Sequence, residues 1–211
     1  MSEGDALKTL ERKAYRSIFD DGIWDLFMGL IILSMGLSTF IGTILHLPEG
    51  WDTIIPVLFI NIIAFLIFYL GKKFITIPRM GFVKFGSKRK VKQLKLKIFL
   101  LFMFIINVIL FLLPLTGLIR NIQIQPLILS LLLGLGVYAF PFCVVAYYLD
   151  FTRLYYYAFL AGIGLFLTEM LYPIVGSPLD TFLSYGITGW AIVAIGLYYF
   201  IRFLKKYPLS E

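Results

Sequence analysis

Three carboxylates lie close together near the start of the chain, at Asp20, Asp21 and Asp25. Asp21 and Asp25 are four residues apart, a spacing that puts two side chains on one face of a helix. Paired carboxylates can hold Mg²⁺ for chemistry on lipid phosphates. A carboxylate at the start of a helix has a simpler use, because it caps free N–H groups and is attracted by the helix dipole. We expect Asp21 to cap the first apolar helix and the cluster to form salt bridges with a basic loop.

The spacing of these acids differs from that of known enzymes acting on lipid phosphates. Prenyltransferase-type sites use two acids, two spacers and an acid, together with a second acidic cluster. Here three residues separate Asp21 from Asp25, and the sequence contains no second cluster. The CDP-alcohol phosphotransferase pattern also begins with Asp-Gly, but its Ala-Arg and two later acids are absent. A lipid-phosphate enzyme using Asp21 and Asp25 is therefore the third of three hypotheses.

Glu169 is the one charge that lies well inside an apolar stretch. A charge at membrane depth is costly and is a functional candidate by default. Ala158, Gly162 and Glu169 follow one another at helical spacing, and small residues on the same stripe favour a neighbouring helix over lipid. We expect Glu169 to face the bundle interior and to be neutral or paired. It would either bond a backbone carbonyl, Ser184 or Thr188, or form a proton- or cation-binding site.

Other catalytic chemistry has little support in the sequence. The chain has one His and one Cys, His46 and Cys143, and neither has a plausible partner for nucleophilic or metal chemistry. Walker A, HExxH, GxSxG and Gly-rich dinucleotide motifs are all missing from the sequence. We therefore expect no metal and no cofactor, and the balance is against an enzyme.

Composition indicates a membrane protein. Of the 211 residues, 60% are hydrophobic and 15% are charged, whereas a soluble domain is roughly half apolar and about a quarter charged. A spanning helix needs about 20 mostly apolar residues. The apolar runs are continuous, whereas barrel strands alternate apolar and polar residues. The prediction is an all-α, polytopic protein with transmembrane helices at about 23–46, 54–71, 98–118, 126–149, 154–174 and 181–203.

The distribution of Lys and Arg predicts the orientation of these helices. An even number of spans puts both termini on one side of the membrane. That side then carries every one of the 19 Lys and Arg residues except Arg120. Because basic residues concentrate on the cytoplasmic side, we expect both termini to be cytoplasmic. The expected location is the plasma membrane.

Three cytoplasmic segments are expected outside the spans: an amphipathic segment at 1–22, a basic loop at 72–97 and a tail at 204–211. The first would lie on the inner leaflet or pack on the protein's own loops. In the loop, beta-prone runs at 74–77 and 82–85 predict a small hairpin, and the later basic residues should begin the third helix. Basic clusters attract anionic lipid at about 1 kcal/mol per residue, and nucleic acid is not expected. The candidate anionic-lipid contacts are Arg79, Lys84, Lys88, Arg89 and Lys90.

Small and polar residues inside the spans predict how the helices pack. Stripes of small residues allow close approach of helix backbones, and they favour a compact bundle or a homodimer over a wide pore. Asn61 and Asn107 should form interhelical hydrogen bonds. Pro141 should kink the fourth helix near residues 137–140. The stripes are Gly29–Gly36–Thr43, Ser130–Gly134, Ala158–Gly162 and Gly189–Gly196.

Short phrases at residues 21–25, 78–85 and 203–208 resemble recurring phrases of small uncharacterised prokaryotic multi-pass membrane proteins. The resemblance implies no activity and no functional residues. The leading hypothesis is an accessory or structural membrane component that acts through lipids or a partner protein. The alternative is a small transporter or channel subunit that uses Glu169.

Overall fold

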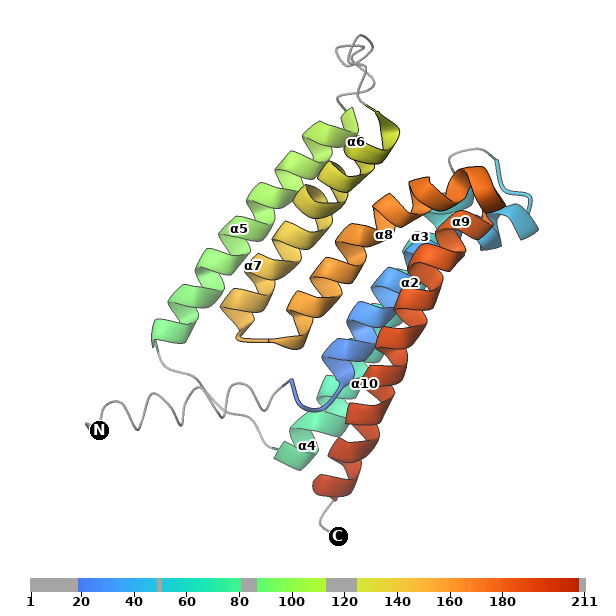
Figure 1. Ribbon diagram of the computed structural model, residues 1–211. Coiled ribbons are helices and arrows are strands. Elements are labelled where there is room, and N and C mark those ends of the chain that lie inside the picture. The colour runs from blue at the N-terminus through green and yellow to red at the C-terminus, as the bar shows by residue number, and fades with distance from the viewer. Residues whose placement is uncertain (1–18, 49–50, 81–86, 113–124, 209–211) are drawn as a thin grey trace. The chain divides into compact units, whose positions relative to one another are not determined.

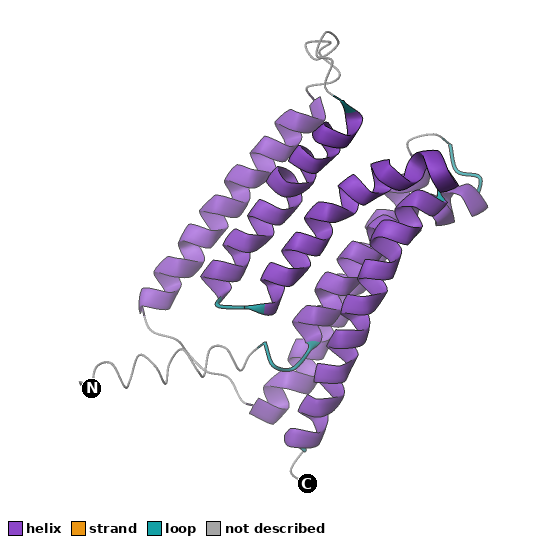
Figure 2. Cartoon of the chain, viewed as in Figure 1, coloured by secondary structure: helices purple, strands orange, loops and turns teal. Residues whose placement is uncertain are grey.

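A computed structural model describes residues 19–48, 51–80, 87–112 and 125–208. Every regular element in this part of the chain is a helix (Figure 2). Six helices are long and apolar enough to cross a membrane, which confirms the predicted all-α fold with six candidate spans. They cover Ile23–Ile44, Trp51–Met80, Val91–Leu110, Pro126–Leu149, Arg153–Val175 and Leu179–Lys206. The amphipathic segment expected before residue 19 lies outside the described residues.

The second span is longer than predicted, because helix continues past the apolar stretch. Helix α3 (Trp51–Gly71) runs into a π-helical segment, η1 (Lys72–Thr76), and then into α4 (Ile77–Met80). The run at 74–77, expected to be the first strand of a hairpin, is therefore helical, and that prediction is wrong. Extending an existing helix adds one hydrogen bond for each residue fixed, which outweighs the local beta preference. The run at 82–85 lies outside the described residues.

The chain divides into two compact units. Unit 1 comprises residues 1–83 and 170–211. In it, α2 (Ile23–Ile44) packs against α3 and against α10 (Ile187–Lys206), as Figure 1 shows. A short helix, α9 (Leu179–Thr181), and a π-helical segment, η4 (Phe182–Gly186), lead into α10. Unit 1 therefore joins the first two spans to the last one.

Glycines set the contact between α2 and α10. A Cβ atom built on Gly29 would lie 2.8 Å from the backbone nitrogen of Val193, and one on Gly189 would lie 2.6 Å from the backbone nitrogen of Leu33. A Cβ on Gly36 would collide with the backbone of Gly186. The helices are thus in backbone contact, and the predicted packing role of the glycine stripes is confirmed.

Unit 2 comprises residues 84–169. It contains α5 (Ser87–Leu112), α6 (Pro126–Leu133), the π-helical segment η3 (Gly134–Ala139), α7 (Phe140–Leu149) and the larger part of α8 (Arg153–Val175). The π-helical segment η3 ends at Ala139 and overlaps residues 137–140, where Pro141 is predicted to kink the helix. The backbone stays helical through Phe140, and the kink itself stays a prediction. A Cβ on Gly134 would collide with the carbonyl oxygen of Gly162, which confirms that these stripes of small residues allow close approach of backbones.

The two asparagines within candidate spans behave differently. Asn61 Nδ2 donates a hydrogen bond to Ser34 Oγ at 3.3 Å, which links α3 to α2 as expected. Asn107 Nδ2 donates to the carbonyl oxygen of Met103 at 2.8 Å, within its own helix. The prediction of an interhelical bond from Asn107 is therefore wrong, because the carbonyl one turn back on the same helix accepts a second hydrogen bond from this side chain.

Candidate functional site

Asp21 is fully buried at the start of α2. Its Oδ1 accepts the N–H of Ile23 at 3.1 Å. Its Oδ2 accepts hydrogen bonds from Lys72 Nζ at 2.6 Å and from Thr76 Oγ1 at 2.5 Å. Lys72 and Thr76 are the first and last residues of η1, so this irregular turn delivers both donors to one carboxylate. The expected salt bridge to the basic loop is confirmed. Asp21 accepts the N–H of the first residue of α2, but Gly22 holds the N-cap position, and the part played by Thr76 was not predicted.

Asp25 is also fully buried, one turn further along α2. Its negative charge acts on the Lys72 ammonium together with that of Asp21. Both Asp21 oxygens are already bound by donors of the chain itself. This arrangement is that of a compensated internal charge, not of an open pair of metal ligands. Among the described residues, no three His, Cys, Asp or Glu side chains are grouped so that they could hold a metal ion.

A second link closes the same end of unit 1. Arg79 NH1 donates a hydrogen bond to the carbonyl oxygen of Tyr207 at 2.8 Å, which joins α4 to the residue after α10. Residues 21–25, the described part of 78–85, and residues 203–208 therefore meet at one end of the three helices. We call this part of the molecule the basic end of unit 1, because Lys72, Arg79, Arg202, Lys205 and Lys206 lie there.

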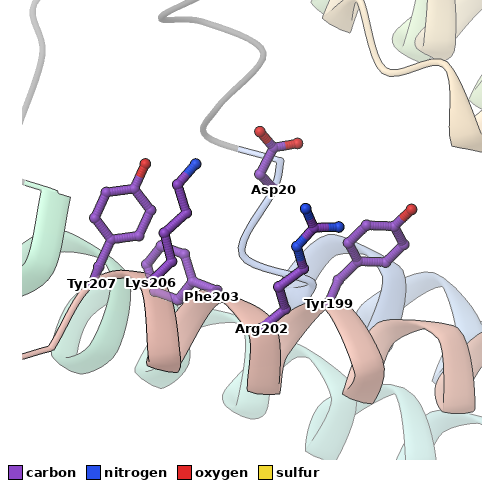
Figure 3. A pocket seen from close by; sticks show the side chains of 6 residues that line it. All are labelled: Asp20, Tyr199, Arg202, Phe203, Lys206 and Tyr207. Atoms are coloured by element: carbon purple, nitrogen blue, oxygen red, sulfur yellow. The ribbon is translucent and has the colours of Figure 1, made fainter.

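A pocket of about 220 Å³ opens at the basic end of unit 1. Figure 3 shows the Asp20 carboxylate, on the loop before α2, next to the charged ends of Arg202 and Lys206 on α10. In the described part of the chain, neither cation forms an ion pair with Asp20 or with any other acid. The lining residues are Asp20, Tyr199, Arg202, Phe203, Lys206 and Tyr207.

Sequence reasoning placed Asp20 in the acidic cluster but did not find this pocket. From the sequence, Arg202 and Lys206 were used only as positive charges that indicate the membrane topology. Their spacing of four, with Tyr199 one turn earlier, was the available signal, since residues at this spacing share a helix face. The approach of Asp20 to α10 depends on the packing of α2 and could not be read from the sequence.

The predicted lipid contacts are partly occupied by other roles. In unit 2, Arg89 NH1 lies 2.7 Å from Asp150 Oδ2 and its side chain is only 10% exposed. Arg89 is thus paired with an acid of the chain, and its contact with lipid stays a prediction. Asp150 Oδ2 also lies 4.0 Å from Lys92 Nζ, and this acid explains why a cation is buried here. Arg79 is half-buried and bonds Tyr207. Lys84 and the side chains of Lys88 and Lys90 lie outside the described part of the structure.

Glu169 lies at the end of unit 2, on α8. Ala158 and Gly162 on the same stripe are buried, but the stripe emerges from the packed part of the unit before Glu169, whose side chain is exposed. The expectation that Glu169 faces a packed interior is therefore not met within unit 2. Its role as a proton or ion site stays a prediction.

No protein-family model, no curated protein and no solved structure matches this chain. Its function is therefore inferred from its own residues.

Proposed function

We propose that this protein is an accessory component of the plasma membrane that acts through membrane lipids at the basic end of unit 1. In this proposal both termini and the loop at 72–97 are cytoplasmic, and the lipids include anionic species of the inner leaflet. A partner protein or a second copy of the chain would bind to the same assembly.

The observation that carries this proposal is a difference in burial between Asp21 and Asp25 and the basic residues of α10 at the basic end of unit 1. Asp21 and Asp25 are fully buried, and Asp21 is held by Lys72 and Thr76. Arg202, Lys205 and Lys206 are exposed on α10. Asp21 and its partner Lys72 therefore hold the helices together, while the three exposed bases of α10 are free to act outward. A basic surface next to apolar spans attracts anionic headgroups.

The exposed apolar surface supports the same proposal. Phe59 on α3 is 64% exposed, and Phe104 on α5 is 66% exposed. Side chains of this size are left uncovered along candidate spans where lipid replaces water as the surrounding medium. The chain thus combines an apolar belt for lipid tails with a basic end for headgroups.

The test is stability of the purified full chain in nanodiscs of defined lipid. Replacing half of a phosphatidylcholine bilayer by phosphatidylglycerol should raise the apparent Tm, and 0.5 M salt should remove about half or more of the rise because salt screens exposed charges. A matched bilayer of equal thickness without anionic lipid is the control. An unchanged Tm would reject action through anionic lipid.

A small transporter or channel subunit is the second candidate, and one observation favours it. Within the described residues, three spans contain π-helical segments: η1, η3 and η4. π-helical turns are rare in proteins overall, and those that occur often lie at functional sites. Ion or proton flux in proteoliposomes, lost in Glu169→Gln with folding retained, would favour this candidate over the accessory role. A lipid-phosphate enzyme is less well supported, because the Asp21 carboxylate is already bound on both oxygens.

A further inference from the structure

We propose that the pocket at the basic end of unit 1 binds the headgroup of an aminophospholipid, with its phosphate at Arg202 and Lys206 and its primary ammonium at Asp20. This inference rests on the proposed function, because it names the lipid that this end of the molecule would select.

Two cations on one helix face provide the phosphate site. Arg202 and Lys206 are four residues apart on α10, so they project on the same side of the helix. Both are exposed, and within the described residues both lack an acidic partner. A guanidinium offers a planar fork of donors that matches phosphate oxygens, and an ammonium adds a point charge. Together they can hold a phosphate diester from one side.

The carboxylate explains why a simple anion is a poor match. Asp20 lines the same pocket and lies beside the two cations, as Figure 3 shows. A lone phosphate would be repelled by this acid. A headgroup that carries an ammonium next to its phosphate turns this repulsion into an attraction. The pocket's two positive charges and one negative charge then each face a group of opposite sign.

The remaining walls suit an ammonium and a short carbon chain. Tyr199, Phe203 and Tyr207 are aromatic, and aromatic faces attract cations. One wall already shows such a contact, since Lys206 Nζ lies 5.2 Å from the centre of the Tyr207 ring. The Arg79 bond to the Tyr207 carbonyl fixes the residue that forms this wall. The volume of about 220 Å³ is roughly seven times the share of one water molecule in liquid water, which suits a phosphate with a two-carbon amine.

The source of the headgroup follows from where the pocket lies. It sits at the last two turns of a candidate span, Leu179–Lys206, where apolar side chains give way to basic ones. A lipid in the adjoining leaflet would place its tails along the apolar part of α10 and its headgroup at this level. A soluble phosphoester would lack the contribution of the tails.

The experiment measures binding of four probes to the full chain in detergent by native mass spectrometry. The probes are dioctanoyl phosphatidylethanolamine, dioctanoyl phosphatidylcholine, dioctanoyl phosphatidylglycerol and soluble glycerophosphoethanolamine. We expect wild type to bind the ethanolamine lipid about tenfold or more tightly than the choline lipid, because a quaternary ammonium cannot donate hydrogen bonds to Asp20. The soluble headgroup should bind at least tenfold more weakly than the ethanolamine lipid.

Three variants assign the contacts. Asp20→Asn should weaken binding of the ethanolamine lipid about tenfold. Binding of the glycerol lipid should be unchanged or tighter, since the repulsive charge is gone. The double variant Arg202→Gln/Lys206→Gln should weaken both lipids about tenfold or more. Lys205→Gln is the matched control, because Lys205 is exposed on the same turn but does not line the pocket. It should leave the preference for the ethanolamine lipid over the choline lipid within about twofold of wild type.

Several results would overturn the inference. If Asp20→Asn weakened binding of the ethanolamine and glycerol lipids equally, the contact between Asp20 and the ammonium would be rejected. If Lys205→Gln weakened binding as much as the double variant, general charge attraction would explain the binding. Equal binding of lipid and soluble headgroup would reject a lipid ligand. If the double variant does not fold, Asp20→Asn still decides, because Asp20 is an exposed loop residue. A lost headgroup preference with the salt-sensitive Tm gain retained would reject this pocket and keep the proposed function, whereas loss of that gain in wild type would reject the proposed function itself.

Discussion

Lys72 Nζ lies 2.6 Å from Asp21 Oδ2, across a separation of 51 residues in the chain. Asp21 is fully buried, and the Lys72 side chain is 17% exposed. The pair joins the start of α2 to the turn that follows α3, at the point where both helices leave their apolar stretches. An ion pair taken out of water is not a strong net source of stability, but removing one partner leaves a buried charge without compensation.

Asp21→Asn should therefore destabilise the protein by about 3 to 5 kcal/mol, because the Lys72 ammonium would lose its closest carboxylate. The double variant Asp21→Asn/Lys72→Met should recover most of this loss. The measurement is the apparent Tm of the purified protein in detergent. Lys73→Gln, at the exposed neighbouring residue, is the control and should change little. A double variant as unstable as Asp21→Asn alone would contradict this account.

Gly189→Ala tests the backbone contact between α10 and α2. The added Cβ would lie 2.6 Å from the Leu33 backbone nitrogen, and a backbone cannot move aside as a flexible side chain can. Overpacking of this kind costs about 1 to 3 kcal/mol, so the Tm should fall. Gly136→Ala is the matched control, because a Cβ there meets nothing within 4 Å. Equal behaviour of the two variants would mean that the helices are not in backbone contact.

Asp150 combines an ion pair with an unusual backbone conformation. It has a positive φ of 53°, and Asp and Asn tolerate this region better than other residues with a side chain. Asp150→Asn should destabilise unit 2 by removing the partner of buried Arg89, and Asp150→Ala should cost about 1 kcal/mol more through backbone strain. Lys92→Gln, at 4.0 Å and 43% exposed, should have a much smaller effect. We expect the Tm to fall most in Asp150→Ala, less in Asp150→Asn and least in Lys92→Gln. A reversed order would contradict the account in which Asp150 contributes both an ion pair and a tolerated backbone conformation.

Orientation is tested by cysteine labelling in a Cys143→Ser background. Ser87→Cys should resist an impermeant maleimide in intact cells and react after permeabilisation, because basic residues concentrate on the cytoplasmic side. Asn121→Cys, in the predicted outer loop beside Arg120, should react in intact cells. Labelling of Ser87→Cys from outside would invert the predicted topology.

Long apolar runs made all six candidate spans predictable, and four of them to within three residues. The second runs on to Met80 and the third begins at Val91, because polar residues beside the apolar run continue the helix. The fourth was expected at about 126–149 and covers Pro126–Leu149. Periodicity also identified Gly29 and Gly189 as packing residues, because a helix repeats its faces at a fixed spacing. Asn61 was identified as a polar residue within an apolar run. The failures lie where local preference and tertiary context disagree. The beta-prone run at 74–77 continues α3 as helix, and within that segment Thr76 bonds Asp21.

The candidate pocket was out of reach for a different reason. Asp20 and Lys206 are 186 residues apart, and only the contact between α2 and α10 brings them together. No spacing rule covers such a distance. The acidic cluster was recognised from local sequence, but its separation into a buried Asp21 and an exposed Asp20 depends on which neighbour each side chain meets.

The glycine contact between α2 and α10 also has a consequence for how the chain is made. Gly36 and Gly186 touch, yet about 150 residues separate them, and all of unit 2 is synthesised in between. At a synthesis rate of roughly 5 to 20 residues per second, α10 is made on the order of ten to thirty seconds after the glycine face of α2 that it contacts. The partner of Asp21 is made sooner, because Lys72 follows at the end of the next span. The first two spans can thus settle as a charge-compensated pair, while the groove for α10 stays open until the last helix leaves the ribosome.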